Sequence, residues 1–334
     1  MIKKSGIALA VAALAANAYA AEFAVGTDTK FEVNVDVSAY YQTAKDTKGD
    51  TSQASLIGKG MNQIEIKATR TINDDISVFG EIELDYDPII DNDKPQTDDT
   101  RFGIASKKFG RFTAGQFDSY FEDNVIEALG VSHGDKAFVT EAGSSNDGRH
   151  LQYLNKIGDL TFAVDLTANN NSAANDGNHG AAIAATYQLG AFSVGLGYSD
   201  VGKYISDIAN ASTTAKEYNK VKNVTGLTAA YKFGNTKVIG LVVSETASES
   251  PELAVLDRNV KTNYSGVAVT HVMGEFDIGV AFQNRETRTK TYSEWSVGLG
   301  YTPFKNMTFW LDMNGLGDTN GKGDVVELGA VYKF

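Results

Sequence analysis

The chain has 334 residues, a formal net charge of −12 and no cysteine. The negative charge disfavours nucleic acid and anionic lipid headgroups as partners, and the lack of cysteine excludes disulfides, thiolate nucleophiles and Cys-based metal sites. The mean hydropathy of −0.22 is typical of a soluble protein. It does not exclude a membrane β-barrel, because the strands of such barrels alternate apolar and polar residues.

Residues 1–20 have the three parts of a secretory signal peptide. Lys3 and Lys4 are basic, Ile7–Ala16 is apolar, and Ala18-Tyr19-Ala20 is an A-x-A cleavage site. The run is too short for a membrane-spanning helix, and a buried N-terminal helix is the weaker interpretation. We therefore expect residues 21–334 to form the mature domain, with a net charge of −14.

Period-two alternation dominates the remaining chain. In Phe31–Tyr41 the odd positions are mostly apolar and the even positions mostly polar, so the two sets face opposite sides of a strand. Fifteen similar segments follow, each near the ~9–11 residues that a tilted strand needs to cross a bilayer. They lie near 60–72, 75–86, 100–109, 110–117, 149–156, 159–168, 180–190, 191–200, 222–233, 236–245, 262–272, 275–284, 291–302, 306–314 and 324–334.

The connections between these segments alternate in length. Short ones such as 109–110, 156–159 and 233–236 alternate with longer polar ones such as 169–179 and 201–221. Short turns at one rim and long loops at the other, on an even number of strands, are typical of outer-membrane barrels. The predicted fold is therefore all-β, a 16-stranded antiparallel transmembrane β-barrel.

The long connection of residues 116–148 is unusual because it is both acidic and apolar. It carries both carboxylates and large apolar side chains, among them Asp118, Glu122, Asp123, Glu127, Asp135 and Glu141, and Phe117, Tyr120, Phe121, Val125, Ile126, Leu129, Phe138 and Val139. A solvated flap does not need that much apolar surface. We expect the loop to fold into the barrel, pack one side on the wall and narrow a water-filled pore.

Several motifs resemble the trimeric general diffusion porins of Gram-negative bacteria. They are Thr71–Asp75, Thr100–Ala105, Phe109–Gly115, Ala128-Leu129-Gly130 and the terminal Tyr332-Lys333-Phe334. The resemblance implies an outer-membrane homotrimer in contact with lipid and lipopolysaccharide. It also implies that Tyr332 and Phe334 form the signal read by the barrel-assembly machinery, and that no cofactor or metal is needed.

In that family, acids of the inward loop face basic residues on the wall. The resemblance implies Glu122, Asp123, Glu127 and Asp135 as constriction acids, although the family's Pro-Glu-Phe-Gly pattern is absent. Arg101 and Lys67 are the expected wall cations. Each alternates along its strand with apolar residues that face lipid, so its own side chain faces the lumen. Arg149 is a third candidate, but it has lipid-face parity relative to Tyr153 unless a bulge intervenes. Polar residues, Asn34 and Gln63, stand where the family often has cations.

The expected function is a passive channel for small hydrophilic solutes and ions, with a cation preference because acids outnumber wall cations. The alternatives are a substrate-specific channel and a barrel that acts mainly as an adhesin or receptor. An outer-membrane enzyme is disfavoured. His133 and His150 lie near acids and serines, but no G-x-S-x-G or metal-spaced His pair accompanies them.

Overall fold

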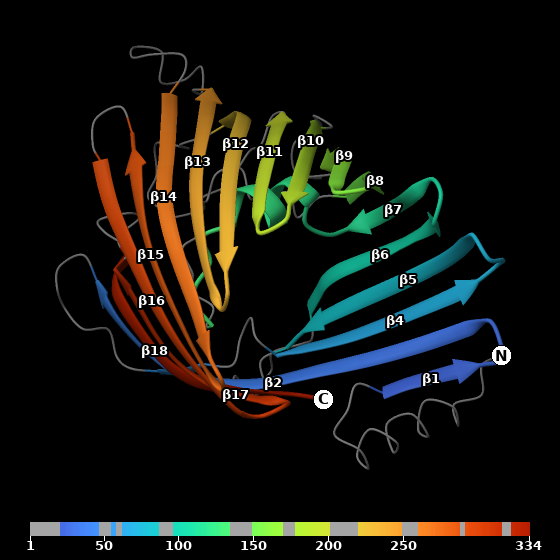
Figure 1. Cartoon of the computed structure of the whole chain (residues 1–334), viewed down its shortest axis with the longest axis horizontal. Coiled ribbons are helices and arrows are strands. Elements are labelled where there is room, and N and C mark those ends of the chain that lie inside the picture. Colours follow the sequence, from blue (N-terminus) through green and yellow to red (C-terminus); the bar gives the residue numbers. More distant parts are fainter. Residues whose placement is uncertain are drawn as a thin grey trace, which may run out of the picture.

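The chain forms a closed, 16-stranded antiparallel β-barrel (Figure 1). The computed structural model describes residues 21–46, 55–57, 62–86, 96–133, 149–169, 178–200, 220–248, 260–287, 291–315 and 322–334. The fold expected from the alternation is therefore confirmed. The signal peptide expected at 1–20 and the loop acid Asp135 lie outside the described residues.

The barrel strands are β2 and β4–β18, which pair in chain order. Their bounds are β2 Thr29–Asp46, β4 Gln63–Thr71, β5 Ile76–Asp85, β6 Gln96–Ser106, β7 Gly110–Gln116, β8 Arg149–Ile157, β9 Leu160–Asn169, β10 Asn178–Leu189, β11 Phe192–Asp200, β12 Lys220–Phe233, β13 Thr236–Ser248, β14 Val260–Met273, β15 Phe276–Glu286, β16 Thr291–Phe304, β17 Met307–Gly315 and β18 Lys322–Lys333. Pairing of β18 with β2 closes the ring.

Two short strands extend this ring at β2. The first, β1 Ala21–Val25, pairs with the beginning of β2, and β3 Ser55–Ile57 pairs with Tyr40–Gln42. The backbone N–H of Phe334 donates to the carbonyl of Val35 at 2.8 Å. Phe334 is thus held to β2 two residues from Val33, the partner of Ala21 at the beginning of β1.

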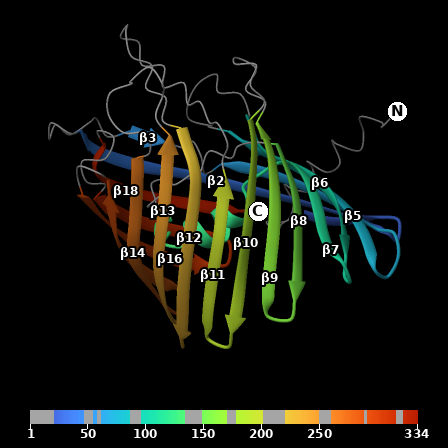
Figure 2. The ribbon, with the colours of Figure 1, turned by 90° about the horizontal axis from the view of Figure 1, so that it is seen from above.

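Four hairpins are closed by two-residue turns that begin with glycine. Gly158, Gly190, Gly234 and Gly274 have φ between 56° and 63°, which the first position of a type I′ or II′ turn requires and which glycine adopts without steric cost. Figure 2 shows such turns at one end of the barrel. The short connections predicted from the sequence are therefore the tight turns of one rim.

Alternation along each strand separates an inner from an outer face. On β12, Val224 and Gly226 are buried toward the lumen, whereas Leu227 is 47% exposed on the outside. The same holds around the barrel, for example at Phe102, Leu151, Ile183, Leu196, Val242, Val280 and Leu328. A continuous exposed apolar band is the lipid-facing surface of a membrane barrel.

Aromatic side chains gather near the rim that carries the tight turns. Phe276 and Tyr301 stack with ring centroids 4.5 Å apart, and Tyr231 stacks with Phe233 at 6.1 Å. Amphipathic rings at such a level suit the headgroup region of a bilayer. Within the described residues, no helix is both long and apolar enough to cross a membrane.

Candidate functional site: a loop inside the barrel lumen

The segment after β7 turns into the barrel instead of away from it. Residues 117–133, here called the constriction loop, include the short π-helix η1 Glu122–Ile126. In Figure 1 this green segment lies inside the ring of strands, beneath β10–β12. The inward path that the apolar residues of 116–148 predicted is present over the described part of that connection.

Apolar side chains of the loop pack against the inner wall. Phe121, Val125 and Leu129 are at most 2% exposed and share one buried cluster with wall residues, among them Leu241 and Val243 of β13. Full burial of such a side chain stabilises the packed state by ~1.5–3 kcal/mol. The loop is therefore bound to one side of the lumen by a small hydrophobic core.

Glycines on the wall make room for the loop. A Cβ added at Gly197, Gly266, Gly279 or Gly298 would lie less than 3.0 Å from a loop atom. At Gly226 the same atom would lie 3.0 Å from both Ile126 and Val125. These positions follow one another across β11, β12 and β14–β16, so the wall offers a side-chain-free path along which the loop lies.

The packed loop leaves three carboxylates open to the lumen. Asp118, Asp123 and Glu127 are exposed. Glu122 is only 4% exposed, and its backbone N–H donates to Ser119 Oγ at 3.2 Å. The loop thus buries Glu122 and exposes its other three described acids to water.

Burial and nearby carboxylates raise the pKa of two of these loop acids, Asp123 and Glu127. The pKa of Asp123 is raised to about 6, first by burial and then by the Asp118 charge, while Arg101 opposes both. Burial, then Asp118 and Asp123, likewise raise the pKa of Glu127. The effect of Arg101 on Asp123 links the loop electrostatically to the wall strand β6.

Two of the three predicted wall cations, Lys67 and Arg101, meet in one ion-pair network on β4–β6. Glu81 joins them: it pairs with Arg101, and with Lys67 at 2.9 Å. Lys67 also lies 3.3 Å from Glu65, and Arg101 lies 3.6 Å from Asp99. The Glu81 side chain is 2% exposed, so its charge is satisfied by the two cations and largely removed from water.

Sequence reasoning missed one cation of this wall. Arg111 of β7 stands over the Phe79 ring at 5.7 Å and is within electrostatic reach of Arg101 and Glu81. Its neighbour Phe112 is 49% exposed on the lipid side, so the parity of β7 already placed Arg111 in the lumen. The wall then has three cations, Lys67, Arg101 and Arg111, balanced by Glu65, Glu81 and Asp99.

The remaining predicted residues lie apart from this network or at its edge. Asn34 donates to Glu65 at 2.5 Å, and Gln63 pairs in register with Asp36 and Asp85. The backbone of Arg149 pairs with Ala168 without a register shift, so the described strand contains no bulge at this position; its side chain lies outside the described residues.

The expected assembly residues lie at the end of the closing strand. The Tyr332 and Phe334 rings meet edge to face at 4.7 Å. Both residues have the parity of the exposed Leu328, and Tyr332 pairs with Val37 of β2. The terminal aromatics therefore belong to the seam that completes the barrel.

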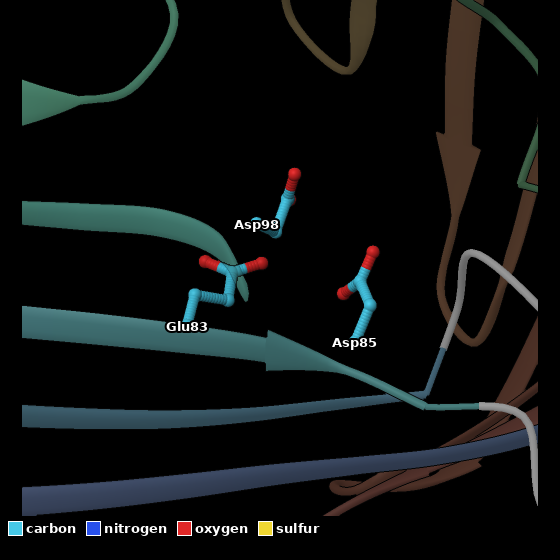
Figure 3. Close-up of side chains that lie close together, drawn as sticks. All are labelled: Glu83, Asp85 and Asp98. Carbon is cyan, nitrogen blue, oxygen red and sulfur yellow. The ribbon is translucent and has the colours of Figure 1, made fainter. Parts of the chain in front are cut away.

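A second group of acids lies where β5 ends and β6 begins. Carboxylate oxygens of Glu83, Asp85 and Asp98 lie within 4.8 Å of one another, and Figure 3 shows these side chains gathered beside the two strands. The cluster adds negative potential on the way to the constriction, and clefts lined by one sign of charge concentrate ions of the other sign.

Replacing Glu81 with glutamine tests the wall network. The amide keeps the shape but removes the charge shared by Arg101 and Lys67, so the wall becomes net positive. We expect the reversal potential to shift toward anion preference. We also expect a loss of stability that lies between two limits: ~0–1 kcal/mol for an exposed ion pair, and ~3–5 kcal/mol for a buried pair that loses one partner. Glu275→Gln, in an exposed turn, is the control; an unchanged reversal potential in E81Q contradicts this role.

The chain belongs to the Gram-negative porin family, whose model matches residues 7–334. A search of curated proteins found no match. Membership of this family places the barrel in the outer membrane and supports a diffusion channel rather than an enzyme.

Solved structures share the fold at low sequence identity. The anion-selective porin from Comamonas acidovorans has a TM-score of 0.72 at 13% identity, over 92% of this chain and 100% of that one. Salmonella typhi OmpF, in complex with daunomycin, has a TM-score of 0.68 at 15% identity, over 94% and 100%. The trimer form of OmpT from Vibrio cholerae has a TM-score of 0.69 at 13% identity, over 92% and 100%.

Proposed function

We propose that this porin is a general diffusion channel with a cation preference, passing small hydrophilic solutes and ions across the outer membrane. The observation that carries this proposal is the charge arrangement in the lumen. Asp118, Asp123 and Glu127 are exposed on the constriction loop, whereas the cations of the facing wall are balanced by acids of the same wall. The narrow region is therefore net negative.

Selectivity follows from charge placement and not from the fold. Charged side chains that line a constriction favour ions of the opposite sign. A porin described as anion-selective shares this barrel, so the sign must come from the residues on the loop and wall. Because Glu122 is buried, we assign the cation preference to the three exposed acids and leave Asp135 as a further candidate.

We also propose a homotrimer secreted with cleavage after residue 20. One similar structure is described as a trimer form, and the terminal aromatics at the β18–β2 seam suit recognition by the barrel-assembly machinery. Lipid and lipopolysaccharide would surround the exposed apolar band. A heat-sensitive band well above the 35.8 kDa of the chain, on a gel of unheated sample, tests the trimer; monomer mobility in mild detergent contradicts it.

Swelling of liposomes that contain the protein tests general diffusion. We expect uncharged sugars to enter at rates that fall smoothly with size. A strong preference for one sugar over others of equal size would favour the substrate-specific alternative. Absence of any permeation by correctly folded barrel would favour the adhesin or receptor alternative.

The cation preference is expected to depend on pH through Asp123. Its pKa of about 6 means that the carboxylate is charged at neutral pH and protonated in mild acid. Cation preference should fall between about pH 7 and about pH 5 as this charge is lost. The check is the reversal potential in a KCl gradient, with Asp123→Asn as comparison: the variant should begin with a weaker preference and change less over this range. An equal pH response in both proteins would contradict the assignment.

A further inference from the structure

His133, the last described residue of the constriction loop, lies between two wall aspartates. Nε2 of His133 lies 2.7 Å from Oδ1 of Asp277 on β15, and Nδ1 lies 3.5 Å from Oδ1 of Asp312 on β17. The backbone N–H of His133 donates to the second oxygen of Asp312 at 2.7 Å. The Asp312 side chain is fully buried, so one loop residue contacts two strands that are not adjacent.

The strand between them leaves space for this contact. A Cβ at Gly300 of β16 would lie 2.6 Å from Nε2 of His133 and would also collide with the Asp277 carboxylate. Beside it, Ser132 Oγ hydrogen-bonds to Ser296 Oγ at 3.0 Å and donates to Asn314 Oδ1 at 3.2 Å. The wall is therefore shaped around residues 132–133.

Only the protonated imidazole satisfies both carboxylates. A neutral histidine carries one N–H and one bare nitrogen lone pair, whereas the imidazolium donates from both nitrogens. In either neutral tautomer, a lone pair would face a carboxylate oxygen of Asp277 or Asp312. Loss of the proton therefore replaces one attractive contact by a repulsive one.

We propose that His133 is a proton-operated latch that holds the end of the constriction loop against β15 and β17 when protonated and loosens it when neutral. The proposal rests on the proposed function, in which this loop narrows the pore. Its consequence is a channel whose loop is fixed in mild acid and moves more at alkaline pH, so that spontaneous closures become more frequent.

Within the described residues, the two charged groups that contact His133 both favour its protonated form. They are Asp277 from β15 and Asp312 from β17, while the inward positions of β16 between them, Ser296, Gly298 and Gly300, carry no charge. The contact of the ring with Asp312 raises the pKa of His133, burial opposes it, and Asp277 adds to the increase. A raised pKa means that the latch is complete below the ordinary ~6.5 and is lost as pH rises through the raised value.

Single-channel recording at constant voltage tests the latch. We expect wild-type channels to close severalfold more often at about pH 8.5 than at about pH 6. His133→Gln should close frequently at both values, because glutamine does not titrate. The control is His271→Gln, whose native ring contacts Thr236 Oγ1 at 2.7 Å and which should behave as wild type. A wild-type pH response in H133Q would overturn the latch.

Chemical labelling tests the latch without relying on conductance. The chain has no native cysteine, so V131C supplies a single thiol at a residue that is 7% exposed. At about pH 6 the V131C/H133Q variant should react with a methanethiosulfonate reagent severalfold faster than V131C, and at about pH 8.5 equally fast. If V131C and V131C/H133Q react at equal rates at about pH 6 as well as at about pH 8.5, the latch is overturned. A difference in labelling in barrels that do not conduct would keep the latch and reject the proposed function.

Discussion

Replacing Gly298 with valine is expected to push the constriction loop off the wall into the lumen, and so to lower the mean single-channel conductance and make closures more frequent. A Cβ at this position would collide with the carbonyl oxygen of Val131 and lie 3.1 Å from Asp312 Oδ1. A backbone carbonyl cannot rotate away as a flexible side chain can, so the loop must move. Overpacking of this kind typically costs ~1–3 kcal/mol.

The matched control is Gly240→Val on β13. A Cβ at Gly240 meets nothing within 4 Å, and valine suits a strand that faces lipid. Conductance of G240V should equal that of wild type, and its heat-modified gel mobility should be unchanged. If G298V folds and conducts as wild type does, the loop is not held in the way described here.

Neutralising Asp123 and Glu127 together is expected to remove most of the cation preference. Both carboxylates are open to the lumen, and the wall opposite is balanced in charge, so Asp118 would remain as the only exposed acid of the described loop. Under a tenfold KCl gradient a perfectly cation-selective pore would reach ~59 mV. The reversal potential of D123N/E127Q should lie much nearer zero than that of wild type.

Asp159→Asn is the control for this charge change. Asp159 lies in the exposed turn between β8 and β9, away from the lumen, so its loss should leave the reversal potential unchanged. A wild-type reversal potential in D123N/E127Q would move the selectivity to other residues, such as Glu83, Asp85 and Asp98.

The sequence predicted the barrel because its signals are local. Alternation over ten or so residues decides which face of a strand meets lipid, and turns such as Gly158-Asp159 are set by two residues. The sixteen expected segments agree with the sixteen barrel strands. The short strands β1 and β3 were not expected, because strands of five and three residues are too short to show a clear alternation.

The loop was predicted in outline but not in detail. Its apolar residues indicated packing inside the barrel, whereas the burial of Glu122 depends on how η1 is rotated against the wall. The bridging role of Glu81 likewise depends on register across β4–β6, which brings Lys67, Glu81 and Arg101 side by side. Parity alone could have identified Arg111, since it lies next to the lipid-facing Phe112.

The most direct test of a cation-preferring pore is the reversal potential of the purified protein in a planar bilayer under a KCl gradient. We predict stepwise conductance increases and a reversal potential on the cation side. A reversal potential on the anion side would keep the channel but contradict the role given to the exposed acids Asp118, Asp123 and Glu127. No conductance from correctly folded barrels would contradict the channel itself.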